Sequence, residues 1–165
     1  MSREWSRVSS DYQAIVAPFL DEAPVRVASI ARALGIEVKA ATLKPRISGQ
    51  IGPSSTSDSG FRIRVNRHES KTRQRFTISH EIAHFLLHQD EIGDGIEDTI
   101  LYRSTLSNRL EVEANRLGAE IIMPARGVSQ HLRELGGRAT PEVASILATR
   151  YNVSEVAMKI RLGIG

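Results

Sequence analysis

The stretch that decides the fold is RQRFTISHEIAHFLLH, residues 73–88, which contains the pattern H-E-I-A-H at 80–84. Residues four apart on an α-helix lie about 40° from each other around the axis, so the imidazoles of His80 and His84 point the same way and can bind one ion. Glu81 is rotated by about 100° from His80, which keeps its carboxylate beside the ion without making it a third ligand. The spacing predicts two metal ligands and an acid/base group acting on metal-bound water.

The flanking residues predict that this stretch is an amphipathic helix. Its apolar side chains recur at the 3.6-residue spacing of a helix and predict a face buried in the core: Ile78, Ile82, Phe85 and Leu86. Its polar side chains gather on the other flank: Thr77, His80, Glu81, His84 and His88. Polar clustering on an otherwise apolar helix calls for partners or a ligand, although a surface helix with chance histidines is the alternative interpretation.

A second helix is expected to supply the third ligand. Asn108 is expected to cap the segment LEVEANRLGAEIIM, residues 110–123, as a helix. Within it, Glu111, Ala114 and Gly118 share one stripe. The two small residues allow the helix to approach another closely, which is what Glu111 needs to reach an ion held by two histidines.

Two other residues are candidates for the third ligand. His88 lies about 12 Å along the axis from His80 on a straight helix, too far to share one ion. Glu113 lies about 200° around its helix from Glu111, away from the small-residue stripe. Glu111 is therefore the favoured ligand, and Asn115, one turn further on, is expected to accept a hydrogen bond from a ligand histidine.

The composition indicates a globular protein and restricts the metal chemistry. The chain has 165 residues, of which 41% are hydrophobic and 25% charged, so residues 1–165 are expected to form one domain. It contains no cysteine, which excludes disulfides and thiolate metal sites and leaves His, Asp and Glu as strong ligands. Zinc (Zn2+) held by two histidines and one carboxylate keeps a fourth position for water, as in catalytic sites.

The compartment follows from what the sequence lacks. The N-terminal segment MSREWSRVSSDYQ is polar and has no apolar signal-peptide core, and no stretch approaches the roughly 18 apolar residues of a membrane span. We expect a cytoplasmic protein without a membrane partner. The net charge of +3 is too small to predict direct binding of nucleic acid.

The rest of the first half predicts helices and strands around the metal helix. Helices are expected over 10–21 and 25–34, and strands over 36–40, 48–51 and 61–66. The last strand is the clearest, because apolar residues alternate strictly with polar ones. Its polar residues, Arg62, Arg64 and Asn66, are predicted to face outward, and the strand is expected to receive the substrate backbone by β-addition.

The C-terminal segment TPEVASILATRYNVSEVAMKIRLG, residues 140–163, suggests a different class of function. It is typical of helix, turn, helix, so a DNA-binding regulator or a toxin-antitoxin component is the alternative. The last helix carries only Lys159 and Arg161 as basic groups, which is little for a phosphate backbone. A third alternative is a zinc-stabilised protein-binding module without turnover. Candidates for stabilising an oxyanion are Tyr102, His131 and Tyr151, each of a type that more often has a structural role.

Two segments resemble the ImmA/IrrE-type metallopeptidases: RQRFTISHEIAHFLLH at 73–88 and EVEANRLGAEIIMP at 111–124. Weaker likeness extends to 27–38 and 153–163, and Ala83 stands where this family often has Gly. The resemblance implies an α+β, minimal zincin-like fold: a small, mostly antiparallel sheet packed on the HExxH helix, with additional helices. It also implies zinc ligation by the two histidines and Glu111, and a helix-turn-helix repressor as the protein substrate, whose removal relieves repression in a stress response.

Overall fold

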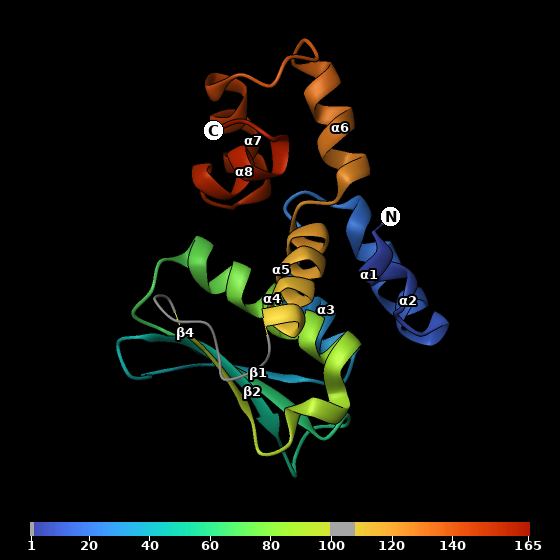
Figure 1. Cartoon of the computed structure of the whole chain (residues 1–165), viewed down its shortest axis with the longest axis vertical. Coiled ribbons are helices and arrows are strands. Elements are labelled where there is room, and N and C mark those ends of the chain that lie inside the picture. Colours follow the sequence, from blue (N-terminus) through green and yellow to red (C-terminus); the bar gives the residue numbers. More distant parts are fainter. Residues whose placement is uncertain (1, 100–107) are drawn as a thin grey trace.

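The computed structural model describes residues 2–99 and 108–165, which form helices and one small sheet, with the three C-terminal helices at the end away from the strands (Figure 1). The helices are α1 (Arg3–Ser6), α2 (Ser10–Val16), α3 (Val27–Ala33), α4 (Lys71–Ile92), α5 (Asn108–Ile122), α6 (Ala125–Glu134), α7 (Pro141–Tyr151) and α8 (Glu155–Leu162). The strands are β1 (Glu37–Ala41), β2 (Ile47–Pro53), β3 (Phe61–Asn66) and β4 (Ile96–Thr99).

The sheet has four strands in the order β1-β3-β2-β4. β1 pairs with β3 in parallel, whereas β2 pairs with both β3 and β4 in the antiparallel sense. Ile63, in the middle of β3, lies between Val38 of β1 and Ile51 of β2. The predicted α+β class with a mostly antiparallel sheet is therefore confirmed.

α4 runs across one face of the sheet, and α5 packs on α4 from the side away from the strands (Figure 1). The α4 helix starts where the Ser70 hydroxyl accepts a hydrogen bond from the backbone N–H of Arg73. The predicted apolar face is buried, with Ile82 at 0% and Phe85 at 1% exposure. A non-helical residue, His88 with φ −130° and ψ 32°, interrupts the helix one turn before its end.

Local sequence signals explain several other boundaries. The helix expected over 10–21 divides into α2 and a 3-10 turn, η1 (Ala17–Asp21), because Pro18 has no N–H and its ring obstructs a continuing α-helix. β3 has the bounds expected from its alternation. The αL backbone of Asn152 separates α7 from α8, where the sequence indicated a turn.

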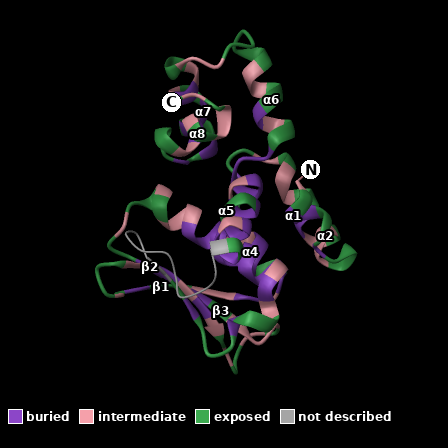
Figure 2. Cartoon of the chain, in the orientation of Figure 1, coloured by how far each residue is buried: buried purple, intermediate pink, exposed green. Residues whose placement is uncertain are grey.

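The hydrophobic core joins these elements and is mainly aliphatic, as 5% aromatic residues require. Figure 2 shows buried residues concentrated in α4, α5 and the strands beneath them. Apart from Phe85 and Tyr151, the largest fully buried side chains are Ile, Leu and Met. Within the described part of the chain, no helix has both the length and the apolar character needed to cross a membrane.

Candidate metal centre

α4 and α5 approach each other most closely at Gly118. A Cβ built on Gly118 would stand 3.0 Å from the Cα of His80 and 3.1 Å from its backbone nitrogen. The Ser79 hydroxyl donates a hydrogen bond of 2.6 Å to the Gly118 carbonyl, which fixes the crossing. Ala114, one turn earlier, is fully buried. The prediction that small residues let the two helices approach closely is confirmed.

This close crossing brings the carboxylate of Glu111 to both histidines. Glu111 Oε1 lies 3.0 Å from His84 Nε2, and Glu111 Oε2 lies 3.3 Å from His80 Nε2. One ligand atom from each of the three side chains lies within 4.8 Å of the others. All three residues are buried, with exposures of 6% for His80, 0% for His84 and 5% for Glu111.

The spacing of these donor atoms fits a metal ion. A tetrahedral zinc ion with bonds of about 2.0–2.1 Å holds neighbouring ligand atoms ~3.3 Å apart. Glu111 presents one oxygen to each histidine, at 3.0 and 3.3 Å, and one ligand atom from each of the three side chains lies within 4.8 Å of the others, so small side-chain adjustments would bring them to one ion. Two imidazoles and one carboxylate also leave a tetrahedral ion one open position.

The electrostatics keep Glu111 in the ionised form that a metal ligand requires. Burial raises the pKa of the Glu111 carboxyl, but hydrogen bonds and charge interactions with His80 and His84 outweigh burial and hold the pKa below its ordinary range. The two imidazoles that face Glu111 thus stabilise its negative charge in the core. A divalent cation at the same point would stabilise that charge further.

Glu81 lies between α4 and the sheet, where β2 passes over the helix. Its side chain is completely buried. A Cβ on Gly49 of β2 would stand 3.5 Å from Glu81 Oε2 and would collide with the methyl group of Thr77. Glycine at this position therefore lets β2 pass directly over the Glu81 carboxylate.

The side of His84 that faces away from Glu111 contacts a second polar group. His84 Nδ1 lies 3.0 Å from Nδ1 of His88, and His88 Nε2 lies 2.9 Å from Oε1 of Glu113. Arg7 donates a hydrogen bond of 2.5 Å to Oε2 of the same carboxylate. Burial lowers the pKa of His88, opposed by its hydrogen bond to Glu113, so the imidazole tends toward its neutral form.

The comparison with known proteins identifies the family of the chain. The model of the M78 peptidases, described as the IrrE N-terminal-like domain, matches residues 31–163. The chain belongs to the M78 peptidase family. The match contains the whole of α4 and α5 and confirms the ImmA/IrrE resemblance, whereas α1 and α2 precede it. No curated protein matches the chain.

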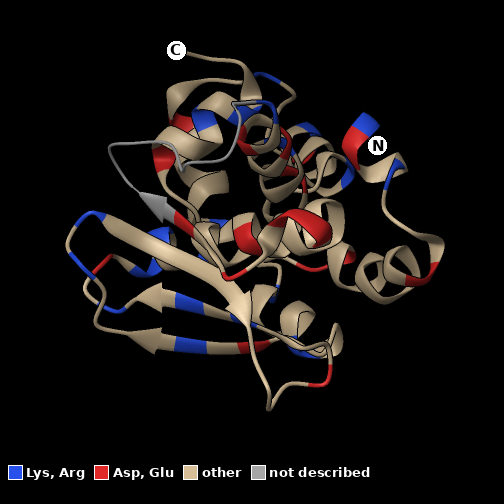
Figure 3. Ribbon diagram, turned by 60° about the horizontal axis from the view of Figure 1, so that its bottom comes forward, with Lys and Arg blue, Asp and Glu red and all other residues tan. Residues whose placement is uncertain are grey.

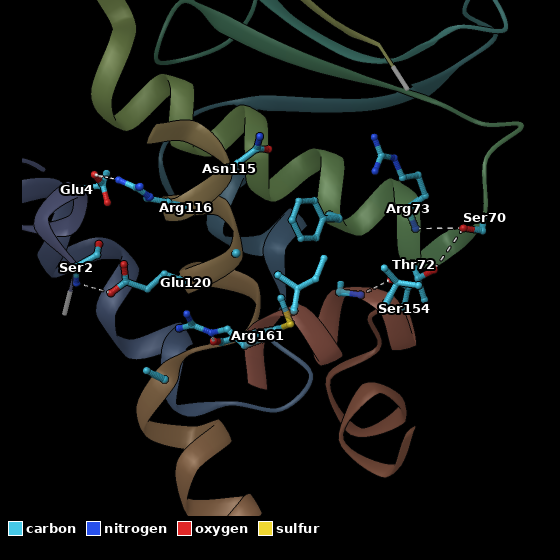
Figure 4. Close-up of a pocket in the computed structure, with 17 residues that line it drawn as sticks. Ser2, Glu4, Ser70, Thr72, Arg73, Asn115, Arg116, Glu120, Ser154 and Arg161 are labelled. Carbon is cyan, nitrogen blue, oxygen red and sulfur yellow. Dashed lines mark hydrogen bonds and ion pairs between the residues drawn. The ribbon is translucent and has the colours of Figure 1, made fainter. Parts of the chain in front are cut away.

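The structure of this M78 peptidase corrects the predicted support for the ligand histidines. Asn115 is exposed and borders a cavity on the far side of α5, so it does not orient a histidine (Figure 4). Glu113 is expected to face away from the site, but it is buried, with 8% of its surface exposed, and forms a hydrogen bond with His88. Two sides of α5 are buried, one by α4 and one by the N-terminal residues, which is why Glu113 does not face solvent.

The prediction of β-addition to the strand Phe61–Asn66 is wrong. β3 is hydrogen-bonded to β1 on one side and to β2 on the other, so it has no free edge. Arg62 and Arg64 lie on the sheet face opposite the buried Ile63, where they border a cavity of about 330 Å3.

Asn66, the third residue of the proposed substrate strand, is a structural residue. It is 2% exposed, and its amide nitrogen lies 2.9 Å from the Ile47 carbonyl and 3.3 Å from the Lys44 carbonyl. Its side-chain oxygen accepts a hydrogen bond from the backbone N–H of His68. Asn66 therefore holds the turn that leads into β2.

The candidates for the oxyanion role separate into two groups. Tyr102 lies outside the described residues. His131 Nδ1 and the Tyr151 hydroxyl are 2.9 Å apart and belong to α6 and α7. Tyr151 is buried in the core, with 1% of its surface exposed, so this pair connects α6 to α7. We assign the oxyanion role to neither residue.

A further cavity is separate from the metal centre. It has a volume of about 950 Å3 and lies between the N-terminal residues, the start of α4, α5 and α8 (Figure 4). Its apolar wall includes Phe76, Met123 and Ile160, and the metal-site residues are not part of its lining.

Proposed function

We propose that this M78 peptidase is a zinc-dependent endopeptidase that hydrolyses a peptide bond in a protein partner in the cytoplasm. The observation that carries the proposal is the convergence of His80, His84 and Glu111 on one buried point. Glu81 directly follows His80 on α4 and is also buried. The His/His/Glu donor set suits zinc better than calcium or magnesium, which prefer oxygen ligands. Family membership supports peptide-bond hydrolysis as the reaction.

His80, His84 and Glu111 would hold the ion, and Glu81 would transfer the proton. Zinc, when bound, lowers the pKa of a coordinated water toward neutrality and polarises the substrate carbonyl. Glu81 accepts the proton of the attacking water and delivers it to the leaving amine as the peptide bond breaks. Burial between α4 and β2 excludes bulk water from this carboxylate and restricts its rotamers.

The substrate backbone would bind at an edge of the sheet, and among the described strands β4 is the edge nearest Glu81. β2 passes over Glu81 at Gly49, and the register pairs Gly49 with Asp98 of β4. β1, the other edge, is two strands away from β2. Proline substitutions at Glu97 and at Asp98 test this proposal, because proline has no N–H to donate to a substrate strand. The variant that loses an outward-pointing N–H should lose cleavage and keep its zinc content. Full cleavage by both folded variants would place the substrate elsewhere.

The substrate we propose is a helix-turn-helix transcriptional repressor, on the strength of the ImmA/IrrE resemblance. The experiment compares cells that produce the wild-type chain with cells that produce Glu81→Gln and identifies newly formed protein N-termini. A new N-terminus within a repressor, present only with the wild type, is the expected result. A zinc-loaded wild type that generates no new N-terminus would instead favour a protein-binding module without turnover.

The alternative of DNA binding is less well supported by the C-terminal helices. α7 and α8 do form a helix, turn and helix, but α8 exposes Val156 at 68% and Ile160 at 74%. Arg161 donates to the Met123 carbonyl rather than projecting freely into solvent. Lys and Arg are distributed over strands and helices, with acidic residues among them (Figure 3). An apolar exposed face does not suit a phosphate backbone.

A further inference from the structure

The strongest unassigned feature is the buried polar chain behind His84, which runs through His88 and Glu113 to Arg7. Its three contacts measure 3.0, 2.9 and 2.5 Å in sequence. The proposed chemistry uses none of these three residues. Polar groups at 1% exposure for His88 and 8% for Glu113 are costly to bury unless their partners are fixed.

The hydrogen-bond directions along this chain are consistent with one arrangement of protons. With a metal ion bound at Nε2 of His84, which lies beside Glu111, the proton of the neutral imidazole would lie on Nδ1. That N–H points at Nδ1 of His88, which must therefore accept and carry its own proton on Nε2. The His88 Nε2–H then donates to the Glu113 carboxylate. In this arrangement each donor faces an acceptor and Nε2 of His84 is free for the metal.

Arg7 anchors the far end of the chain. Its guanidinium donates to Oε2 of Glu113, which leaves Oε1 of the same carboxylate to accept from His88. Arg109 is further from this carboxylate, at 3.7 Å, and its side chain is 70% exposed. Arg7 directly follows α1 and precedes the residues matched by the M78 family model. The N-terminal residues are thereby connected to the metal centre.

We propose that His88, Glu113 and Arg7 are positioning residues that hold His84 in the tautomer and ring orientation required for metal binding. The proposal rests on His84 being a metal ligand, as the proposed function requires. Groups that hydrogen-bond to the outer nitrogen of a ligand histidine orient the ring and increase its basicity. Removing them typically weakens metal affinity by about tenfold to a hundredfold.

The test measures the zinc dissociation constant by chelator competition on the full chain. His88→Leu removes the acceptor for the His84 N–H and should weaken zinc binding by roughly tenfold or more, whereas His88→Gln supplies an amide oxygen and should recover part of the loss. Glu113→Gln should also weaken binding, because an amide N–H facing His88 disfavours the required tautomer.

Arg7→Gln and Arg116→Gln form a matched pair that separates positioning from packing. Arg116 pairs with Glu4 at 3.7 Å and, like Arg7, joins the N-terminal residues to α5 (Figure 4). Arg7→Gln should weaken zinc binding by about threefold, being one bond further from the ligand, and Arg116→Gln should leave it unchanged. This pair also decides the question if a substitution of buried His88 prevents folding.

Nitrogen NMR of isotope-labelled histidine in the zinc-loaded protein reads the tautomers directly. The expected result is His84 protonated on Nδ1 and His88 protonated on Nε2. The proposal is overturned if His88 carries its proton on Nδ1, or if folded His88→Leu and Glu113→Gln bind zinc as tightly as the wild type. A folded wild type that binds no zinc would instead overturn the proposed function itself.

Discussion

Gly118 of α5 presses against the backbone of His80 in α4, so that a Cβ on Gly118 would stand 3.0 Å from His80 Cα. The atoms on both sides of this contact belong to backbone and cannot rotate away. The distance between the two helices, and with it the reach of Glu111 to the histidines, is therefore set by the absence of one methyl group. Packing and metal binding depend on the same glycine.

Gly118→Ala should push the two helices apart and weaken zinc binding. Overpacking typically costs about 1–3 kcal/mol, against which alanine in a helix regains about 1 kcal/mol, so we expect a net loss of up to roughly 2 kcal/mol in the free energy of unfolding. Zinc competition and denaturant unfolding measure the two effects.

Gly127→Ala is the matched control for this prediction. A Cβ there would stand 2.6 Å from the Tyr151 hydroxyl, so the substitution strains the C-terminal helices but not the metal centre. It should lower stability and leave zinc affinity unchanged. Equal zinc affinity in the wild type and Gly118→Ala would show that the spacing of the helices does not control the site.

Glu81→Gln should separate zinc binding from turnover. The amide keeps the size of the side chain in its buried position but cannot take a proton from water, so cleavage should fall by roughly a hundredfold or more while zinc content stays at about one ion per chain. Metal analysis and cleavage of the identified substrate measure the two properties. Cleavage at the wild-type rate would assign proton transfer to another group.

Glu111→Gln should lower zinc affinity and activity together. The amide removes the negative ligand and leaves two histidines, and Glu120→Gln is the control because Glu120 is buried to the same 5% exposure on the same helix. Glu120 accepts a hydrogen bond from the Ser2 backbone and does not belong to the candidate ligand set. Loss of zinc in Glu120→Gln with retention in Glu111→Gln would refute the ligand assignment.

Sequence patterns predicted the elements that are decided locally. Strict alternation predicted β3 with its observed bounds, and the H-E-x-x-H spacing placed both histidines on one side of α4. The stripe of Glu111, Ala114 and Gly118 predicted which side of α5 meets α4, because small residues are needed where two backbones approach.

Features that depend on distant neighbours were not predictable in the same way. Alternation shows which face of β3 is buried but not whether other strands flank it, so its central position was missed. Glu113 was placed on the far side of α5 from Glu111, but the sequence did not reveal that His88 and Arg7 cover that side. The sequence did contain one indication of the contact between His84 and His88: the two histidines are four residues apart, which places them side by side on a helix.

Acidification should release the metal. Binding requires both imidazoles to be neutral, so protons compete with zinc below the ordinary imidazole pKa of about 6.5, by up to about a hundredfold in affinity per pH unit for two histidines. Because the pKa of Glu111 is held below its ordinary value, its carboxylate stays charged throughout the pH range in which the imidazoles titrate, and the loss of zinc reflects protonation of the histidines. Chelator competition between pH 7.5 and 5 measures the effect, and constant affinity would contradict a two-histidine site.

Asn66→Ala should destabilise the protein without affecting zinc. The substitution leaves the Ile47 and Lys44 carbonyls without their side-chain donor, at a cost of roughly 1–3 kcal/mol in unfolding free energy. Arg62→Gln, on the exposed face of the same strand, should change stability by less than about 0.5 kcal/mol. Denaturant unfolding distinguishes the two, and equal stability would contradict the structural role of Asn66.

The position of the metal tests the central claim most directly. Crystals of the zinc-loaded protein, measured at the zinc absorption edge, should show one anomalous peak about 2.0–2.2 Å from Nε2 of His80, Nε2 of His84 and a carboxylate oxygen of Glu111. A peak bound instead by His88 and Glu113, or no peak at full zinc loading, would contradict the proposed centre.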